Sequence, residues 1–588
     1  MVAFEIMETV WKTVRGQLKT ASDREFERTA LHYLRIIWPM LIQSPMMQRL
    51  DRFGVDMCEL ESDGDFNGHF KVVIQAKGFK VDEQLLMSQV EDQILPSIKK
   101  FLDSPLTCDH YVLLHNREGS NRELAAIIQE HLDYLIQAGK AKSVQLWDCH
   151  SFIKDVRNQL EIYIRAKLTK QSLCLLKQHS NFFYFGDLFV SQVPFRQFKW
   201  KPDELLSEEF IDSEFINTDI TPLISSPREA RYSLLIGSFG VGKTTATLRT
   251  TNVQGLLVIH VPAYAINRKQ GSQGTNFLLR NLNDELDLLD DFLPETVEIL
   301  KDLMGAALGR ILRKADDQFV LVIDGLDEHP FYGTAYGLQW LTNELAELRC
   351  PIVLTTRREH FLSLISNYGL AFEALSKKNG ARRPIDILEL GAWRRAQAHE
   401  LLEQVRAALP TDAPQLVNLN RLSEQLDSPS TQLSASLLSH PLFLQMTLDL
   451  IMEGEDWLLE NEDSLIETWI RKKIKRDFRV PRLNNGLMLD IESYVEGMIE
   501  AMVQIAVEMQ QGESSTLCES DTISAQNVLV IVRKSVDIPN LDIATVLMTS
   551  LLVPLNRRLG KPMQVKFFHR SIQEFLVRRN SAVLEALG

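Results

Sequence analysis

A short segment near the middle of the chain constrains the fold more than any other. Residues 237–244 read Gly-Ser-Phe-Gly-Val-Gly-Lys-Thr, after an apolar stretch at 233–236 and before a stretch that can open a helix. A glycine-rich loop between a buried strand and a helix lets backbone N–H groups surround phosphate oxygens, and the helix dipole favours the same anions. A chance glycine-rich turn is the alternative, but all four fixed positions of the pattern are present in this context. The segment therefore predicts an α/β sheet with a loop that binds the phosphates of a nucleoside triphosphate.

The loop residues are predicted to play different roles. Lys243 can reach the outer phosphates, and the hydroxyl of Thr244 can bind Mg²⁺. The glycines let the backbone pass close to the phosphates. The residues predicted to contact ATP or ADP are Gly237, Ser238, Phe239, Gly240, Val241, Gly242, Lys243, Thr244 and Thr245.

A second segment completes the predicted nucleotide site. Residues 319–323 form a continuous apolar run that ends in Asp324. Such a run is typical of a parallel strand buried on both faces, and ligands of open α/β sheets bind at the carboxyl ends of these strands. Asp324 is therefore predicted to hold Mg²⁺, and the carboxylates of Asp327 and Glu328 to polarise an attacking water. Arg357 ends the next apolar stretch and is predicted to sense the γ-phosphate; an ordinary surface arginine is the alternative.

The apolar and polar patterns predict a multidomain chain of α/β and then mainly α structure. Its 588 residues are enough for about four domains. We expect an α/β domain at 1–170, a connecting segment at 171–230, a nucleotide-binding core with a parallel sheet at 231–391, a helical lobe at 392–485 and a C-terminal lobe at 486–588. In the first domain, helices are predicted over 5–19, 23–43, 82–102 and 120–138, and strands over 54–60, 69–76, 111–115 and 143–147.

Charge and cysteine usage bear on location and partners. The formal net charge is −14, so contact with nucleic acid would need a local basic groove. The six cysteines form no Cys-x-x-Cys pair, which fits a reducing compartment. The first residues have no apolar core of signal type, and no run of eighteen apolar residues occurs. These features predict a cytoplasmic protein without a membrane partner.

Three further segments carry a family resemblance. Residues 324–328 read Asp-Gly-Leu-Asp-Glu, residues 440–444 read His-Pro-Leu-Phe-Leu, and residues 567–576 read Phe-Phe-His-Arg-Ser-Ile-Gln-Glu-Phe-Leu. With the phosphate loop, they resemble the NACHT-type STAND ATPases, signal-transduction ATPases that include animal inflammasome receptors and bacterial anti-phage proteins. The resemblance implies a helical lobe whose Pro441 packs near adenine and a winged helix whose His569 contacts the bound diphosphate.

This resemblance implies a nucleotide switch. ADP is expected to bridge the core and the winged helix in a closed form. Exchange for ATP, or a trigger of phage or host origin, is expected to shift the population to an open form that assembles into a homo-oligomer. The sequence ends soon after Phe575, so sensing is expected to use these lobes or a separate partner.

A second candidate site lies in the first domain. Asp56 precedes Gln75 and Lys77, and the last two share one face of a predicted strand because strand side chains alternate. Asp56 can be a Mg²⁺ ligand, Lys77 can orient or activate a water, and Glu27 on a preceding helix can add a carboxylate. The arrangement resembles the PD-(D/E)xK restriction-endonuclease fold, especially the Mrr-like branch, in which glutamine often replaces the second acid. Val55 stands where that family name has proline.

These resemblances predict a defence protein in which the ATP switch controls Mg²⁺-dependent cleavage of duplex DNA. One alternative is that the first domain is an inactive or purely interacting module. Another is a restriction ATPase that translocates along DNA, which predicts rapid DNA-stimulated turnover where the switch predicts slow turnover. The densest basic stretch, at 471–482, could track DNA, but its pattern favours a solvated helix face.

Overall fold

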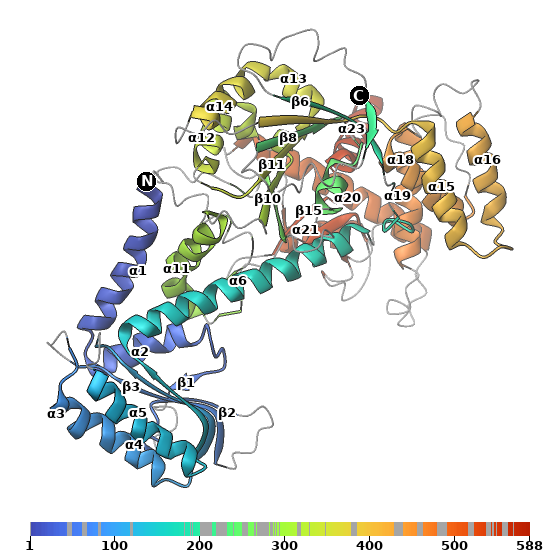
Figure 1. Cartoon of the computed structure of the whole chain (residues 1–588). Helices are drawn as coiled ribbons and strands as arrows, with labels where there is room; N and C mark the ends of the chain where they lie inside the picture. Colours follow the sequence, from blue (N-terminus) through green and yellow to red (C-terminus); the bar gives the residue numbers. More distant parts are fainter. Residues whose placement is uncertain are drawn as a thin grey trace. The chain divides into compact units, whose positions relative to one another are not determined.

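The structure is a computed structural model of the chain (Figure 1), and its contacts divide the chain into two compact units. Unit 1 comprises Met1–Lys167 and Leu288–Ile311, and unit 2 comprises Leu168–Asp287 and Leu312–Gly588. The described residues are 2–43, 50–60, 68–79, 84–117, 122–180, 183–188, 190, 192–199, 215–218, 232–238, 240–249, 257–263, 266, 282, 286, 288–289, 291–292, 294–313, 319–328, 330–346, 348–377, 385–427, 439–455, 462–478, 491–515, 523–536, 543, 546–547, 550–554, 563–567 and 570–587.

Unit 1 is built on a five-stranded mixed sheet in the order β1-β2-β3-β4-β5. Its first three strands pair antiparallel, and β3, β4 and β5 pair parallel. The strands are β1 (Ile42–Gln43), β2 (Met57–Leu60), β3 (His69–Lys77), β4 (Thr107–His115) and β5 (Ala141–Trp147). The predicted α/β alternation of this region is therefore confirmed.

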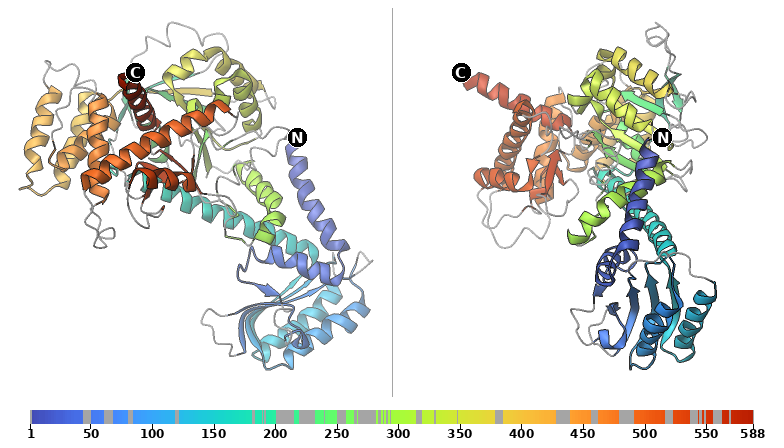
Figure 2. Two further views of the ribbon diagram at one scale, coloured as in Figure 1. Left: turned by 180° about the vertical axis from the view of Figure 1, so that it is seen from behind. Right: turned by 90° about the vertical axis from the view of Figure 1, so that its left-hand side faces the viewer.

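Helices cover both faces of this sheet (Figure 2). The helical elements are α1 (Val2–Thr20), α2 (Asp23–Leu34), η2 (Asp51–Phe53), α3 (Met87–Gln89), the π-turn η3 (Val90–Ile94), α4 (Leu95–Leu102), α5 (Arg122–Gln137), α6 (Cys149–Ser180) and α11 (Pro294–Arg313). Leu124, Ile128, Leu132 and Leu135 of α5 recur at helical spacing and are buried in one core with Tyr111 of β4.

Two predicted helices differ from the observed ones. The helix expected over 23–43 ends at Leu34, and turns follow it up to Pro39. A proline disfavours helical backbone in the residue before it and has no N–H of its own, so the helix stops early. The helix expected over 82–102 is divided by the π-turn just before Pro96, where a wider turn accommodates the missing donor.

The packing of α2 against β3 requires a glycine directly after the strand. A Cβ on Gly78 would lie 2.7 Å from Asp23 Cα and 2.8 Å from Phe26 Cβ. The backbone N–H of Gly78 donates to Asp23 Oδ1 at 2.7 Å. The first turn of α2 is therefore held against the carboxyl end of β3, close to Lys77.

Unit 2 contains a sheet whose seven described strands run in the order β7-β6-β12-β8-β11-β10-β9. The five strands from β12 to β9 are parallel, and β6 and β7 add antiparallel at one edge. The strands are β6 (Val193–Lys199), β7 (Ile216–Thr218), β8 (Tyr232–Gly237), β9 (Leu257–Pro262), β10 (Phe319–Asp324), β11 (Ile352–Arg357) and β12 (Ile385–Leu390). The predicted parallel sheet is confirmed.

Strand β6, which lies between β7 and β12, is joined to β12 by a buried ion pair. Arg196 lies directly opposite Glu389 of β12 in the register, and its Nη2 is 2.7 Å from Glu389 Oε2. The guanidinium also lies 4.5 Å from the centroid of the Phe215 ring. Both β6 and β7 fall within residues 171–230, so the segment expected to connect two domains supplies strands to the nucleotide-type core.

The helices around this sheet are α9 (Lys243–Arg249), η6 (Leu326–Glu328), η7 (Pro330–Gly333), α12 (Ala335–Leu345), α13 (Arg358–Ser363) and α14 (Ile365–Lys377). They are followed by α15 (Arg395–Ala408), α16 (Gln415–Asp427), α18 (Pro441–Met452), α19 (Glu462–Phe478), α20 (Ile491–Ser515), α21 (Ala525–Ser535) and α23 (Arg570–Leu587). Strands β13 (Ile523–Ser524), β14 (Leu552–Pro554) and β15 (Gln564–Phe567) form a small antiparallel sheet.

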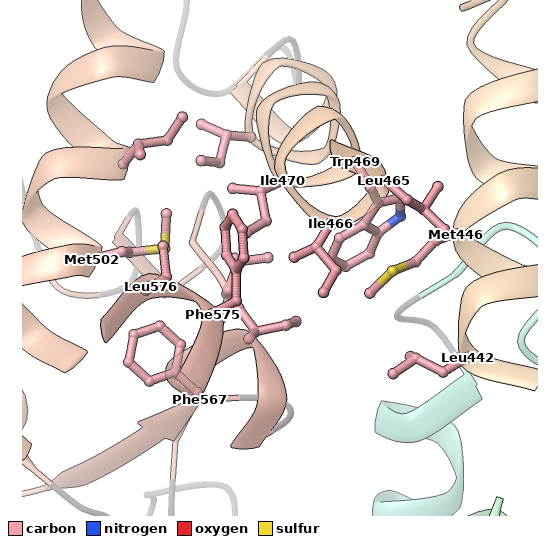
Figure 3. Close-up of a cluster of buried hydrophobic side chains, with 14 of the residues drawn as sticks. Leu442, Met446, Leu465, Ile466, Trp469, Ile470, Met502, Phe567, Phe575 and Leu576 are labelled. Atoms are coloured by element: carbon pink, nitrogen blue, oxygen red, sulfur yellow. The ribbon is translucent and has the colours of Figure 1, made fainter. Parts of the chain in front are cut away.

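The later helices share one hydrophobic core with this small sheet. Trp469 and Ile470 of α19 are each 1% exposed, and Phe575 of α23 is 4% exposed. Figure 3 shows Ile470 beside Phe575, with Phe567 of β15 below them. Burying aromatic and branched side chains of this size contributes roughly 1.5–3 kcal/mol each. The mainly helical region expected from the sequence is therefore a packed lobe.

Candidate functional site

The glycine-rich loop leaves the carboxyl end of β8 and leads into α9, as the sequence predicts. Gly240 and Gly242 have φ angles of +69° and +93°, which side chains rarely tolerate. A Cβ on Gly237 would lie 2.7 Å from Val241 Cγ2. The glycines are thus required by the shape of the loop itself. Phe239 lies outside the described residues.

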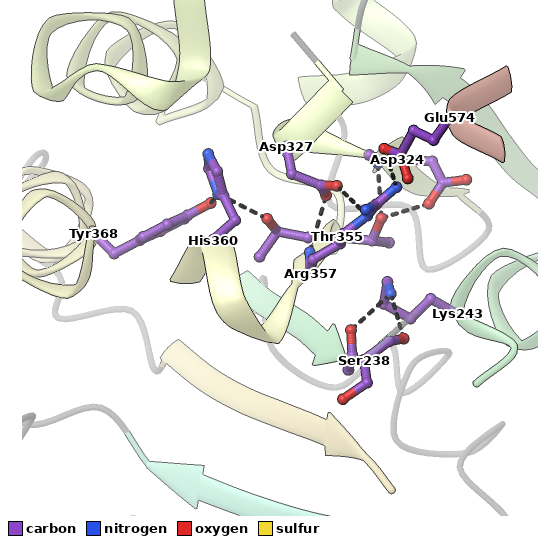
Figure 4. A network of polar contacts seen from close by, with 12 residues as sticks. Ser238, Lys243, Asp324, Asp327, Thr355, Arg357, His360, Tyr368 and Glu574 are labelled. Carbon is purple, nitrogen blue, oxygen red and sulfur yellow. Dashed lines mark hydrogen bonds and ion pairs between the residues drawn. The ribbon is translucent and has the colours of Figure 1, made fainter. Parts of the chain in front are cut away.

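The lysine of the loop lies across the loop backbone (Figure 4). Lys243 Nζ donates to the carbonyl oxygens of Gly237 at 2.8 Å and Ser238 at 3.2 Å. Its ammonium group is therefore next to the loop rather than extended into solvent. A group with three donors can exchange these carbonyls for phosphate oxygens without moving its backbone.

The loop and the strand-end acid meet through a hydroxyl. Thr244 Oγ1 donates to Asp324 Oδ2 at 2.8 Å, although the two residues are far apart in the sequence. Thr355 of β11 donates to the other carboxylate oxygen and accepts from the N–H of Gly325 at 2.8 Å. Burial alone would raise the pKa of Asp324, but the contact with His260 and the two hydroxyl donors outweigh it and hold the pKa below its ordinary value.

A histidine on the neighbouring strand approaches the same carboxylate. His260 of β9 pairs in register with Val322, two residues before Asp324, so all three side chains leave the same face of the sheet. His260 Nε2 lies 3.3 Å from Asp324 Oδ2, and the imidazole is 10% exposed. No sequence motif singled out His260 or Thr355. The sequence signal that could have indicated His260 is its position as a polar residue inside an otherwise apolar strand.

Arg357, at the end of β11, is held by two carboxylates. Its Nε lies 3.0 Å from Asp327 Oδ2, and its backbone N–H donates to Asp327 Oδ1 at 2.9 Å. Its Nη2 lies 3.3 Å from Oε1 of Glu574 on α23 (Figure 4). Asp327 is thus engaged by an arginine, and Glu574 is a contact that the sequence analysis did not predict. Glu328 ends η6, and nothing further is described for its side chain.

The first turn of α18 lies directly on the phosphate loop. The N–H of Leu442 points to the carbonyl oxygen of Gly240 at 3.4 Å, and a Cβ on Gly240 would lie 3.4 Å from Leu442 Cβ. Pro441 is the first residue of this helix, so the structure places it beside the loop. His569 lies outside the described residues.

In unit 1, two of the predicted nuclease residues meet at the ends of β2 and β3. Lys77 Nζ lies 3.6 Å from Asp56 Oδ2, and the two side chains are 15% and 8% exposed. The same oxygen accepts the backbone N–H of Ala76 at 2.9 Å. An acid and a lysine are therefore held together at a largely buried strand end.

The other two predicted nuclease residues are placed differently. Gln75 is fully buried; its Nε2 donates to Gly54 O at 3.0 Å, and its Oε1 accepts from Tyr111 OH at 2.9 Å. Both ends of the amide are therefore used within the protein. Glu27 lies one helical turn beyond Asp23 on α2, on the face that meets the end of β3.

The basic stretch of α19 is paired with acids. Arg471 pairs with Glu467 and Glu496, and Lys473 lies 2.9 Å from Asp477. The remaining described cations also have partners: Lys472 with Glu455, Lys475 with Glu492, and Arg476 with Asp449. The structure gives these cations acidic partners, which the sequence pattern did not predict, and a DNA-tracking surface is disfavoured because the positive charges are already neutralised.

Among the residues that the structure describes, no three or more His, Cys, Asp or Glu side chains are placed together to hold a metal. At the loop, the candidate donors are instead two such residues, Asp324 and His260, together with the hydroxyl of Thr244. None of the described helices is both long and apolar enough to cross a bilayer.

No protein-family model matches the sequence, and no curated protein matches it significantly. Among solved structures, the chain is similar to the ORC1 protein of Aeropyrum pernix in complex with DNA, at 16% identity over 68% of this chain and 100% of that one, with a TM-score of 0.25. It is also similar to Cdc6p from Pyrobaculum aerophilum, at 11% identity over 61% and 91% of the two chains, with a TM-score of 0.25.

A third solved structure is a STAND protein with a tetratricopeptide repeat sensor from Pyrococcus horikoshii, at 14% identity and a TM-score of 0.29. That similarity covers 61% of this chain and 41% of the other. TM-scores this low do not establish a shared fold. The nucleotide-type site therefore depends on its own geometry.

Proposed function

We propose that unit 2 is an ATP-binding switch of the NACHT-type STAND class that hydrolyses ATP slowly. The observation that carries the proposal is the contact of 2.8 Å between the Thr244 hydroxyl and the Asp324 carboxylate. It joins the helix after the glycine-rich loop to the acid that ends a parallel strand. These are the two groups that a metal–nucleotide complex needs side by side.

The donors at this position fit Mg²⁺. A hydroxyl and a carboxylate are hard oxygen donors, and Mg²⁺ in nucleotide sites uses one or two protein ligands and otherwise phosphates and water. Mg²⁺ would supply charge stabilisation at the phosphates. Lys243 would exchange its loop carbonyls for outer phosphate oxygens, and Arg357 would approach the γ-phosphate. Asp327 and Glu328 would orient the attacking water.

The contacts between lobes support the switch. The first turn of α18 touches Gly240 of the loop, and Glu574 of α23 reaches Arg357. A change in the bound phosphates would therefore alter the contacts of α18 and α23. Pro441 would pack near adenine, and His569, which follows β15, would contact the diphosphate. A trigger would release these contacts and permit self-association.

The test of the switch is nucleotide retention. Lys243→Ala should lower the affinity for a fluorescent ADP analogue at least tenfold, because it removes the cation that faces the phosphates. Lys472→Ala, on α19 in the same unit and paired with Glu455, is the matched control and should bind as the parent does. Equal binding by the Lys243 variant and the parent would refute the assignment of the loop.

We further propose that unit 1 is a Mg²⁺-dependent endonuclease of the Mrr-like type, acting on duplex DNA in defence against phage. The contact between Asp56 and Lys77 at 3.6 Å supports it, because it places a potential metal ligand beside a cation that can orient water. Gln75 would have to give up its bonds to Gly54 or Tyr111 before its carbonyl could reach a metal. Asp56, with Glu27 as a further acid, is therefore the main candidate for holding the metal.

Cleavage of plasmid DNA in the presence of Mg²⁺, ATP and extract from infected cells tests this second proposal. Lys77→Ala should remove cleavage while nucleotide binding stays intact. Lys71→Ala is a matched control on the same strand, because Lys71 is 50% exposed and paired with Glu59. Undiminished cutting by the Lys77 variant would show that this residue has no part in the chemistry.

Two other functions remain in competition, each with its own outcome. If unit 1 only recruits a partner, no condition yields cleavage although Lys243 is still needed for signalling. If the protein is a translocating restriction ATPase, duplex DNA should accelerate ATP turnover strongly, whereas the switch predicts slow turnover with or without DNA. The neutralised cations of α19 give no support to a DNA track there.

A further inference from the structure

The imidazole of His260 is a buried polar group that contacts the Asp324 carboxylate without an aligned hydrogen bond. Its Nε2 is inaccessible to solvent and hydrogen bonds to none of the described residues. An unsatisfied polar atom in such a position costs roughly 1–3 kcal/mol, so its presence in an apolar strand calls for a reason. The nearest carboxylate oxygen, Asp324 Oδ2, is 3.3 Å away but not aligned for a hydrogen bond.

The geometry around Asp324 Oδ2 suggests that reason. The same oxygen lies 2.8 Å from Thr244 Oγ1 and 3.3 Å from His260 Nε2. In an octahedral metal site with bonds of about 2.1 Å, neighbouring donor atoms are about 3 Å apart. The two observed separations lie on either side of that value. Oxygen and nitrogen donors are thus already spaced as neighbours in one coordination shell.

We propose that His260 is a third protein donor at the metal site, so that the site accepts a divalent transition ion such as Mn²⁺ through an imidazole nitrogen. The inference rests on the proposed nucleotide function of the loop. Carboxylate and hydroxyl oxygens alone suit Mg²⁺, whereas imidazole favours first-row transition ions. His260 would therefore raise the preference of the site for Mn²⁺ over Mg²⁺. If it only steered Asp324 by a hydrogen bond, it would leave that preference nearly unchanged.

Pulsed electron paramagnetic resonance on the full chain with Mn²⁺ and ADP tests the inference. The parent protein should show nitrogen hyperfine coupling to Mn²⁺, and labelling its histidines with ¹⁵N should change that coupling from the ¹⁴N to the ¹⁵N pattern. Labelling separates histidine from the nitrogens of adenine. In His260→Gln the histidine signal should disappear. In His360→Gln it should remain, because His360 bonds to Thr356 and Tyr368 instead.

Binding measurements complete the test. His260→Gln should weaken Mn²⁺-dependent retention of ADP about tenfold or more and change Mg²⁺-dependent retention far less. If the parent binds Mn²⁺ and ADP without any coupling from ¹⁵N-histidine, the inference is overturned while the nucleotide function stands. If the parent fails to retain ADP both with Mn²⁺ and with Mg²⁺, the nucleotide function itself fails. The labelled parent decides the question even if the variant does not fold.

Discussion

At the scale of single residues, His115 shows how folding can change the chemistry of a side chain. It ends β4 and is fully buried. Burial lowers the pKa of His115 from 6.5 to about 4; nearby Arg117 adds to the effect, and Asp148 opposes it. The N–H of Arg117 donates to Nδ1 at 3.3 Å, and Nε2 has no hydrogen-bond partner among the described residues.

This histidine predicts a loss of stability in mild acid. Between pH 6.5 and about pH 4, His115 is protonated in the unfolded chain but neutral in the folded one. The stability of unit 1 therefore falls as the pH is lowered through this window. The loss amounts to about 3 kcal/mol at 1.36 kcal/mol per pH unit. Hydrogen exchange of β4 amides, compared at each pH with His115→Gln, measures it. Substitution of the exposed His110 should leave the pH dependence as in the parent, and parallel curves for the parent and His115→Gln would rule the effect out.

Residue-level roles were only partly predictable from the sequence. Lys243 and Thr244 belong to one loop pattern and Asp324 ends a buried strand, so their proximity could be anticipated from the loop and strand pattern. The hydrogen bonds of Gln75 could not, because they depend on Gly54 and Tyr111, which only the folded sheet brings to the amide. Such contacts depend on which strands become neighbours in the sheet, and the local pattern of one strand does not specify its neighbours.

At the scale of elements, β6 is the main departure from expectation. Its sequence, Val-Pro-Phe-Arg-Gln-Phe-Lys, contains a proline and two cations, and these residues argue against a strand. Proline is tolerated at the beginning of a strand, where Pro194 lies, and Arg196 is compensated by Glu389 across the pair with β12. By contrast, α5 was predictable from its helical hydrophobic period, and β8, β10 and β11 from their apolar runs.

The Arg196–Glu389 pair predicts strong coupling between β6 and β12. Arg196→Met leaves Glu389 buried with Arg358 as its remaining partner, so unit 2 should lose about 3 kcal/mol of stability. Adding Glu389→Leu should restore part of this loss, because both buried charges are then gone. Urea unfolding with hydrogen exchange of β12 measures each step.

Arg406→Met is the matched control for this cycle. Arg406 pairs with Glu403 on the surface of α15, where such a pair contributes about 0.5 kcal/mol. If Arg196→Met were as mild as Arg406→Met, the buried pair would not hold β6 against β12. If the double variant were less stable than Arg196→Met by another full increment, the two charges would act independently.

At the scale of the whole molecule, the Arg357–Glu574 pair connects the nucleotide core to the last helix. The pair is partly exposed, so its contribution is about 1 kcal/mol or less. Glu574→Gln should therefore speed the release of bound fluorescent ADP by up to about fivefold, because the closed form loses the stabilisation that this ion pair contributes. Stopped-flow displacement by unlabelled ADP measures the rate.

Asp463→Asn provides the comparison for that experiment. Asp463 pairs with Arg578 of α23 at 2.9 Å, but it comes from α19 and not from the nucleotide core. Its loss should leave ADP release close to the parental rate. Equal acceleration by both variants would mean that α23 is loosened in general, and that Arg357 has no special part in holding the nucleotide.

The turn between α1 and α2 has a practical consequence for dissecting the protein. The buried Asn116 directs its amide nitrogen toward the carbonyl oxygens of Leu18, Lys19 and Ala21, and its Oδ1 accepts the N–H of Phe79 at 2.9 Å. Trimming the polypeptide to begin after Ala21 would strip this amide of three acceptors at once. A fragment cut there would be prone to proteolysis around β4, so α1 belongs in any excised version of unit 1.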